Sequence, residues 1–258
     1  MILDYDGKGL TARPRLVQQV RAQLAGAQWE FARQQHEAIA ADWQQRLQRK
    51  PQLFNGEVLM SLPPRFEDTA AALPLFTARY AELLHWQDHP PGSDGVRLPY
   101  AVPVPVTRDG GLVLGVMAAH TANAGMSYFP SGTLSGEDVA ADGTVDLHRA
   151  MLREIVEECG FAPSLLRTAG DWLMLETARS LACFVPVCIA LDDAQVLAAF
   201  TAHAARSPGH ELDALHIVHA RADLAGLELP IVQKRYFDLY FGGYLHLPLQ
   251  QQGAAVDA

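Results

Sequence analysis

The chain has 258 residues, of which 49% are hydrophobic and 19% charged, and its formal net charge is −9. This composition is typical of a globular protein with one large domain, or with a core domain and an extension. The acidic balance argues against nucleic acid and membrane surfaces as partners, because both select basic patches. The opening MILDYDGKGL lacks a signal-peptide pattern, and no stretch reaches the roughly 18 apolar residues of a membrane helix. The three cysteines show no CxxC spacing, so we expect a cytoplasmic protein with reduced, buried thiols.

Residues 1–97 are expected to form an N-terminal extension that is mainly helical, with one hairpin. Apolar residues recur near helical spacing from Pro14 to Lys50, which predicts one or two helices. The turn dipeptide Asn55-Gly56 lies between two apolar runs and predicts the hairpin. Residues Asp68–Trp86 predict a further helix, and HPPGSDG (His89–Gly95) is the expected linker.

Residues 98–250 differ in character, because short apolar runs alternate with turns and amphipathic stretches. Strands are predicted in YAVPVPVT, LVLGVMAAH, SYFPSG, LACFVPVCIAL and ALHIVHA, and helices in AQVLAAFTAHAAR and PIVQKRYFDLYF. Because these elements follow each other without strict βαβ alternation, we predict an α/β fold around one mixed β-sheet. Residues 251–258 are expected to form a polar tail.

The most informative string is REIVEECGF, which spans Arg153 to Phe161. On a helix, Glu154, Glu157 and Glu158 fall within an arc of roughly 100°, opposite an apolar side. Gly160 is suited to end such a helix. Three like charges on neighbouring turns repel one another, so water and salt, or a cation, must compensate for them.

Carboxylates at this spacing can converge on a hard divalent cation such as Mg²⁺ or Mn²⁺, which binds phosphate oxygens at the same time. Such an ion polarises a pyrophosphate and orients a water molecule. Arg153 could hold one carboxylate by charge-assisted hydrogen bonds. The alternative is a solvated acidic face with an Arg–Glu pair, and the helix alone leaves both interpretations open.

The full string matches the signature R-E-U-x-E-E-x-G-U, where U is aliphatic or aromatic, and it resembles the Nudix hydrolase family. Two neighbouring strings agree: FPSG (Phe129–Gly132) is similar to the FPGG turn that opens the motif of this family, and AMLRE (Ala150–Glu154) is similar to its AALRE. The resemblance implies an α/β/α sandwich around a mixed sheet, in which a loop-helix-loop holds metal ions against a diphosphate. The implied reaction is hydrolysis of a nucleoside diphosphate linked to another group.

The same resemblance assigns roles to individual residues. It implies that Glu154, Glu157 and Glu158 are metal ligands, and that the carbonyl group of Ser131 faces the metal as well. Glu154 could instead take part in activating water. Arg153 would orient a glutamate through a salt bridge, so Arg153, Glu154 and Glu157 are the expected catalytic residues of the helix.

Many members of the family add an acidic residue from a later loop. In SPGHELDALHIV, Glu211 and Asp213 stand just before a predicted strand, and Glu211 is the expected catalytic residue, with Glu176 as an alternative. The ordinary interpretation of these acids is loop polarity. Histidines without a clear motif are usually structural, although a histidine metal site is conceivable; those considered are His210, His216 and His219.

One departure from the family pattern concerns the loop before the helix. The loop from Gly132 to Arg153 is longer than usual, and Val145 stands where the family has a glutamate. Asp146 or Glu137 could substitute for that glutamate. Asp146 has a second interpretation as the N-cap of the helix. The residue that replaces the missing glutamate is therefore open.

Three stretches bear on the substrate. KPQLFNG (Lys50–Gly56) is similar to the extension of Nudix enzymes that act on UDP-sugars, so a UDP-sugar or related nucleotide is expected. GMSYFPSG (Gly125–Gly132) fits the end of the coenzyme A diphosphatase motif, but Thr121 stands where that motif has an arginine, which argues against coenzyme A. The aromatic residues of RYFDLYFGGY could stack a base, or they could belong to the core or an oligomer contact.

We therefore predict a metal-dependent pyrophosphohydrolase with Mg²⁺ or Mn²⁺ as cofactor and a small-molecule nucleotide as substrate. A homodimer is an open possibility. The rival is a Nudix domain that senses a nucleotide without cleaving it: the intact R-E-x-x-E-E favours the enzyme, and the missing upstream glutamate favours the sensor. In a third interpretation the helix is only an acidic surface.

Overall fold

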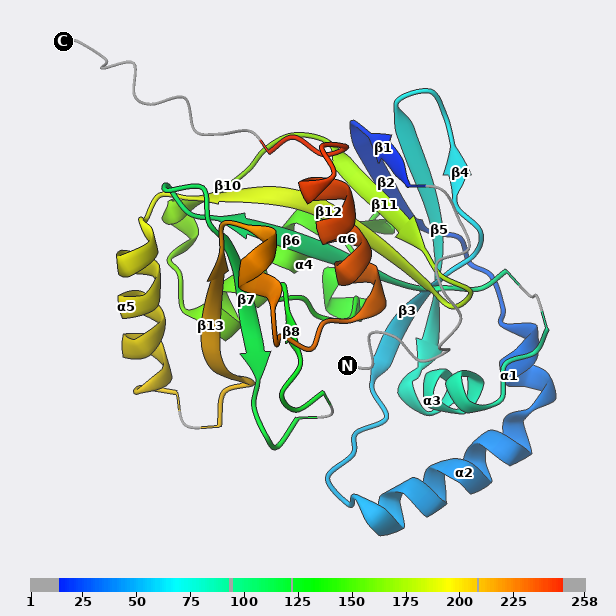
Figure 1. The fold of residues 1–258 in the computed structure, drawn as a ribbon. Helices are drawn as coiled ribbons and strands as arrows, with labels where there is room; N and C mark the ends of the chain where they lie inside the picture. Colours follow the sequence, from blue (N-terminus) through cyan, green and yellow to red (C-terminus); the bar gives the residue numbers. More distant parts are fainter. Residues whose placement is uncertain (1–13, 93–94, 122, 208, 248–258) are drawn as a thin grey trace.

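The structure is a computed structural model that describes residues 14–92, 95–121, 123–207 and 209–247. Its larger sheet has eight strands in the order β1-β11-β12-β6-β7-β13, with β10 paired to β12 and β8 paired to β7 (Figure 1). The strands are β1 (Arg15–Val17), β6 (Leu98–Val106), β7 (Leu112–Met117), β8 (Ser127–Tyr128), β10 (Leu166–Thr168), β11 (Trp172–Glu176), β12 (Ser180–Ile189) and β13 (Leu212–Val218). Strands β6 and β12 are parallel and the other pairs are antiparallel, so the sheet is mixed, as predicted.

Helices α4 (Leu147–Glu154) and α6 (Ile231–Phe241) cover opposite faces of this sheet (Figure 1). Leu173 and Phe184 are cross-strand partners and share one face, where the Phe184 ring stacks on Tyr236 of α6 at 4.9 Å between ring centroids. Trp172 points to the other face, because side chains alternate along a strand, and its ring meets His148 of α4. The predicted α/β sandwich around a mixed sheet is thus confirmed. Helix α5 (Asp193–Ala204) precedes the edge strand β13.

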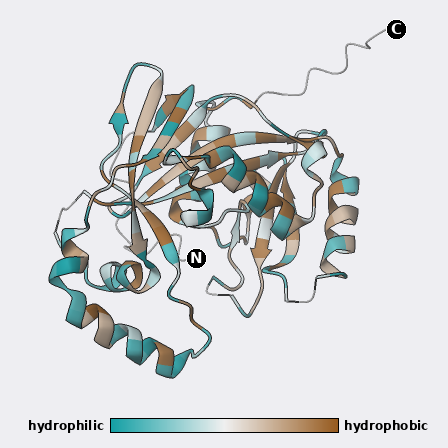
Figure 2. Cartoon of the chain, turned by 180° about the vertical axis from the view of Figure 1, so that it is seen from behind, coloured by the Kyte–Doolittle hydropathy of each residue, from teal (hydrophilic) through white to brown (hydrophobic). Residues whose placement is uncertain are grey.

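The smaller sheet has five strands in the order β3-β5-β2-β9, with β4 paired to β5. These are β2 (Gln19–Leu24), β3 (Glu57–Ser61), β4 (Arg65–Phe66), β5 (Ala70–Arg79) and β9 (Thr144–Val145). The helices of this part are α1 (Glu30–Gln34), α2 (His36–Arg49) and α3 (Tyr80–Asp88). Figure 2 shows hydrophobic residues concentrated in the strands, whereas α2 carries many hydrophilic ones.

Three local predictions for this part are wrong. The helices expected from Pro14 onwards begin only at Glu30, because residues 15–24 form β1 and β2. The helix expected over Asp68–Trp86 is β5 followed by α3, because β5 pairs with β2 on one side and with β3 on the other. The Asn55-Gly56 turn does not form a hairpin. Instead, the Asn55 side chain accepts a hydrogen bond from an N–H at the start of α3, at 2.8 Å.

Each sheet contains one short strand from the part of the chain on the other side of the expected linker. Strand β1 belongs to the N-terminal part and pairs with β11 of the larger sheet, whereas β9 comes from the later part and pairs with β2 of the smaller sheet. The division at residues 97 and 98 stays a prediction, and the tail 251–258 lies outside the described residues. The three cysteines are buried, as predicted. In the ranges that the structure describes, no helix is long and apolar enough to cross a membrane.

Candidate functional site

The candidate site is centred on helix α4, whose N-terminus is set by Asp146. The Asp146 side chain accepts a hydrogen bond from the backbone N–H of Arg149 at 3.0 Å, which is the N-cap arrangement. Of the two roles considered for Asp146, the structure therefore has the cap. The side chain of Glu137, the other candidate to replace the missing glutamate, is exposed, and its carbonyl oxygen accepts a hydrogen bond from the Arg149 guanidinium at 2.9 Å.

The second half of the glutamate string differs from the continuous α-helix that was expected. Helix α4 ends at Glu154, and residues Ile155–Cys159 form a π-type turn (η2) that ends at Gly160, whose φ is +73°. Isolated π turns inside helices occur frequently at functional sites. The His203 ring of α5 lies against this turn, with its Nε2 atom 3.0 Å from the carbonyl oxygen of Glu157. A contact from a distant helix therefore accompanies the local change of helix type.

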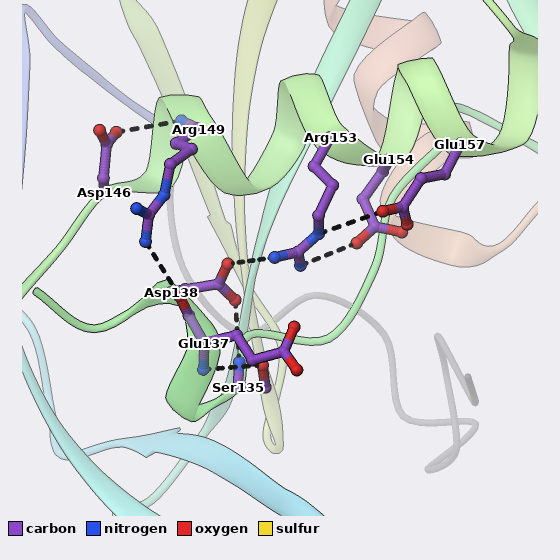
Figure 3. Close-up of polar contacts among 8 residues, drawn as sticks. All are labelled: Ser135, Glu137, Asp138, Asp146, Arg149, Arg153, Glu154 and Glu157. Carbon is purple, nitrogen blue, oxygen red and sulfur yellow. Dashed lines mark hydrogen bonds and ion pairs between the residues drawn. The ribbon is translucent and has the colours of Figure 1, made fainter.

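Arg153 lies between an aspartate and two glutamates (Figure 3). One nitrogen of its guanidinium group donates to Asp138 at 2.6 Å, a second donates to Glu154 at 3.2 Å, and Nε lies 4.0 Å from a Glu157 oxygen. The ion pair with a glutamate that was expected for Arg153 is therefore present. Asp138 is fully buried and also accepts from the backbone N–H of Ser135 at 3.0 Å.

Asp138 was not among the candidates from the sequence. It lies 15 residues before Arg153 in the long loop, within a short 3₁₀ helix (η1, Gly136–Asp138), and so falls outside the spacing that was counted. The pattern Ser135-x-x-Asp138, which forms a capping box here, was the available signal. Asp138 is the acidic residue of this loop that binds Arg153, so it is the best candidate to replace the missing upstream glutamate.

Glu154 packs against a glycine. A Cβ atom added to Gly132 would lie 2.2 Å from the carboxylate carbon of Glu154, so any other residue here would displace this carboxylate from its position. The Glu154 side chain is 17% exposed. Burial raises its pKa above the usual range, although the hydrogen bond from Arg153 acts in the opposite direction. Glu157 is the solvated member of the group, with 61% of its side chain exposed.

Glu158 is buried, although the helix pattern placed it on the polar side. Burial, together with the charges of Glu154 and Glu211, raises the pKa of its carboxyl to about 9. Its Oε2 atom has no hydrogen-bond partner among the described residues, and the same holds for the buried Oγ of Ser131. Within the part of the chain that the structure describes, Glu158 is therefore a buried carboxyl with acidic neighbours and one oxygen that accepts no hydrogen bond.

Glu211 lies next to the start of β13, and its carbonyl oxygen accepts from the N–H of Ala118 at the end of β7. Burial raises the pKa of the Tyr128 phenol, and the charges of Glu158 and Glu211 add to that rise. The structure thus brings Glu211, predicted from a loop more than 50 residues after the helix, into the electrostatic neighbourhood of Glu158.

The donor set fits a hard divalent cation, because it consists of carboxylate oxygens, one of them buried and without a partner. Convergence is weaker than the resemblance implies: among the residues described, no three His, Cys, Asp or Glu side chains group closely enough to hold a metal ion. The glutamates nearest to Arg153 are turned towards its guanidinium group. The residues therefore fit the cation by chemistry, and the side-chain arrangement shown is that of ion pairs with Arg153.

The other candidates from the sequence lie in structural contacts. His219 binds Asp193 at 2.7 Å between Nε2 and Oδ2, and the His210 ring lies 6.0 Å from that of Phe200. His216 is a strand residue opposite Leu114. Glu176 ends β11, where it pairs with Leu181.

The aromatic residues of α6 form part of the core. Tyr236 and Phe237 are both buried, and the ring of each contacts Phe129. The Tyr236 ring also stacks on Phe184. Tyr236 also borders a cavity of about 380 Å³, which Phe184 and Tyr244 line as well. Because α6 covers the face opposite to α4, these rings lie on the other side of the sheet from the glutamates (Figure 1).

No protein-family model and no curated protein matches the chain. Among solved structures, the MutT protein from Methanosarcina mazei Go1 is 17% identical with a TM-score of 0.40, over 58% of this chain and 96% of that one. A NUDIX hydrolase from Nitrosomonas europaea is 16% identical with a TM-score of 0.36, over 60% of this chain and 99% of that one. RenU, a Nudix hydrolase from M. smegmatis, is 13% identical with a TM-score of 0.34, over 58% of this chain and 86% of that one. The chain is thus similar, over part of its length, to solved structures named as Nudix hydrolases, the family that REIVEECGF resembles.

Proposed function

We propose that this chain is a metal-dependent Nudix hydrolase that cleaves the pyrophosphate linkage of a nucleoside diphosphate derivative. The observation that carries the proposal is Glu158, a buried carboxylate with an unpartnered oxygen beside Glu154 and Glu211. A buried carboxylate with like-charged neighbours is costly unless it is protonated or paired with a cation. The R-E-x-x-E-E string supplies these carboxylates in the order that the family uses for metals.

The residues around the helix have distinct tasks in this proposal. Glu157, Glu158 and Glu154 hold Mg²⁺ or Mn²⁺, with the Ser131 carbonyl as a further oxygen donor. When bound, the cation offsets the charge of the diphosphate and lowers the pKa of a water molecule. Arg153 fixes the Glu154 carboxylate, while Gly132 leaves space for it.

Two further steps concern protons. Since the pKa of Glu158 lies near 9 without a cation, this carboxyl is protonated at neutral pH and releases its proton when a cation binds. Glu211, which comes from a separate loop, is the proposed acceptor of the proton from the attacking water. An acid on a loop can act as general base only within hydrogen-bond reach of that water.

The substrate we propose first is a UDP-sugar or a related nucleotide, on the likeness of the Lys50–Gly56 stretch to the extension of such enzymes. Coenzyme A is disfavoured because Thr121 replaces an arginine of its motif. A second candidate function is nucleotide sensing without cleavage. It is favoured by Val145 at the position of the missing glutamate and by the lack of three converging ligand side chains in the described ranges.

The test is hydrolysis of a nucleotide panel by the wild type, Glu157→Gln and Glu37→Gln, with Mg²⁺ or Mn²⁺. The panel contains UDP-sugars, ADP-ribose, NADH, dinucleoside polyphosphates, coenzyme A and nucleoside triphosphates, and products are separated by chromatography. Glu37 is the matched control, because its side chain is 91% exposed on α2. We expect Glu157→Gln to lower kcat by about 100-fold or more, with no change for Glu37→Gln.

Cleavage of no panel member by wild-type protein that binds Mn²⁺ would contradict the enzyme proposal. If one of those nucleotides also raised the melting temperature in the presence of Mg²⁺, the sensing function would take its place. Equal rates of nucleotide hydrolysis for the wild type and Glu157→Gln would mean that this glutamate helix has no part in the mechanism.

A further inference from the structure

The segment between Gly132 and helix α4 is bound by the N-terminal part of the chain. Strand β9 of this segment pairs with β2. Further hydrogen bonds join the segment to β2 and β3: Leu24 N–H to the Gly143 carbonyl at 2.9 Å, Leu59 N–H to the Leu134 carbonyl at 2.9 Å, Gln23 Nε2 to the Asp142 carbonyl at 2.9 Å, and Thr144 Oγ1 to Gln23 Oε1 at 3.1 Å. Both strands of the extension therefore hold the loop that precedes the glutamate helix.

Contacts within the segment connect its strand β9 to Asp138. An antiparallel bridge joins Val139 to Val145, and the turn between them has Gly143 at a φ of +81°. The N–H of Asp146, the cap of α4, points to the carbonyl oxygen of Asp138 at 3.3 Å. Loops of this length without such contacts have many conformations available to them. Contacts with β2 and β3 restrict the segment to one of these.

From Asp138 the connection continues to the glutamates. Its buried carboxylate binds Arg153 at 2.6 Å, and Arg153 binds Glu154 at 3.2 Å (Figure 3). Because the Asp138 side chain is fully buried and tied to the backbone of its own loop, its position follows the position of that loop. A shift of the loop on β2 therefore moves the partner of Arg153.

We propose that the N-terminal extension positions the metal-binding carboxylates, and that Gln23 is a positioning residue for them. Gln23 uses both ends of its amide on the segment, the nitrogen on Asp142 and the oxygen on Thr144. It reaches the glutamates through the segment, Asp138 and Arg153. This inference rests on the proposed metal-dependent function, and it gives the extension a task at the active site.

The experiment compares Gln23→Ala with Gln19→Ala in the full chain. Gln19 is an exposed glutamine of the same strand, and its side chain accepts from Arg21. Mn²⁺ affinity is measured by electron paramagnetic resonance, alongside the melting temperature and the kinetics of nucleotide cleavage. We expect Gln23→Ala to bind Mn²⁺ about 10-fold more weakly and to lose kcat by a similar factor, with KM changed by less than about twofold. Gln19→Ala should match the wild type.

A second pair of variants separates positioning from general destabilisation. Gly143→Ala and Gly226→Ala place a Cβ at φ values of +81° and +82°, so both add similar backbone strain. Only at Gly143 does the new Cβ approach Gln23, at 2.9 Å from its Nε2, whereas at Gly226 it meets nothing within 4 Å. We expect both to lower the melting temperature, and only Gly143→Ala to weaken Mn²⁺ binding.

The outcomes distinguish the two proposals. If the wild type binds Mn²⁺ and cleaves a nucleotide, but Gln23→Ala and Gly143→Ala retain the Mn²⁺ affinity and kcat of their controls, the positioning role is overturned. If the wild type neither binds Mn²⁺ nor cleaves any nucleotide, the proposed function itself is overturned, and the positioning role with it.

Discussion

Replacing Glu158 by glutamine removes a buried carboxyl whose Oε2 atom has no hydrogen-bond partner among the residues described. Burial, with Glu154 and Glu211 nearby, raises its pKa from an ordinary value of 4.5 to about 9. Between these two values the folded protein keeps the proton that the unfolded chain has released. The stability associated with this carboxyl is therefore fully present below the unfolded pKa, and it is lost progressively as the pH rises towards the folded pKa.

The size of the effect follows from the two pKa values. One pKa unit corresponds to about 1.4 kcal/mol, so the loss of stability reaches about 3 kcal/mol at pH 7, which is 2.5 units above the unfolded value of 4.5. Glutamine is neutral at every pH and has nearly the shape of the protonated glutamate. Metal-free Glu158→Gln should therefore be more stable than the wild type by about 3 kcal/mol at pH 7, and about equal to it at pH 4.

Urea unfolding in the presence of EDTA measures this difference at pH 5, 6, 7 and 8. The expected gap between Glu158→Gln and the wild type grows by about 1.4 kcal/mol per pH unit. Glu157→Gln is the control, because it makes the same substitution in the same turn at a side chain that is 61% exposed. Replacing EDTA by Mn²⁺ should stabilise the wild type and not Glu158→Gln. A gap that is independent of pH, or a glutamine variant less stable than the wild type at pH 7, would refute this reasoning.

Two further substitutions test the contacts around Arg153. Gly132→Ala should weaken Mn²⁺ binding by about 10-fold, because the new Cβ occupies the place of the Glu154 carboxylate, while Gly92→Ala, with open space around it, should leave titrations of Mn²⁺ unchanged. Asp138→Asn should lower the free energy of unfolding by about 3 kcal/mol, because it leaves Arg153 without its buried partner. A loss below about 1 kcal/mol in urea unfolding would mean that this ion pair behaves like a surface one.

The apolar side of the glutamate helix was predictable from periodicity, since Ile155 and Cys159 are buried as the 3.6-residue spacing requires. The burial of Glu158 and the π turn were not predictable in this way. Both depend on neighbours from other parts of the chain, including His203 of α5, which contacts the turn at the Glu157 carbonyl. Local pattern determines which side of a helix is apolar, but the hydrogen-bond register at its end also responds to tertiary contacts.

The partner of Arg153 was missed because the prediction relied on a fixed distance along the chain. Counting back from Arg153 leads to Val145 and Asp146. Val145 lies in β9, where it pairs with β2, and Asp146 is the N-cap of α4. Asp138 lies further back, since the turn between Val139 and Val145 lengthens the path. A spacing rule transfers only between loops of equal length, whereas the need of a partly buried guanidinium such as that of Arg153 for a carboxylate is independent of spacing.

The N-terminal strands were mistaken for helices for a related reason. Residues 14–50 are rich in alanine, glutamine and arginine, which favour helices when no other contacts intervene. Strand β2 is stabilised by hydrogen bonds to β5 and β9, whose residues lie about 50 and about 120 positions away in the sequence. Strand preference depends on such cross-strand partners more than on local composition, so a reading of neighbouring residues could not detect it.

The long loop before α4 is held in place by the N-terminal sheet. A 15-residue segment from Gly132 to Asp146 would be a poor support for Asp138 on its own, because ordering each residue costs about 1–2 kcal/mol of backbone entropy. Pairing β9 with β2 supplies hydrogen bonds that offset this cost, and β1 fastens the extension to the larger sheet through β11. The extension is therefore joined to the rest of the chain at both the sheet edge and the loop. This arrangement makes the geometry of the glutamates depend on residues more than 100 positions earlier in the sequence.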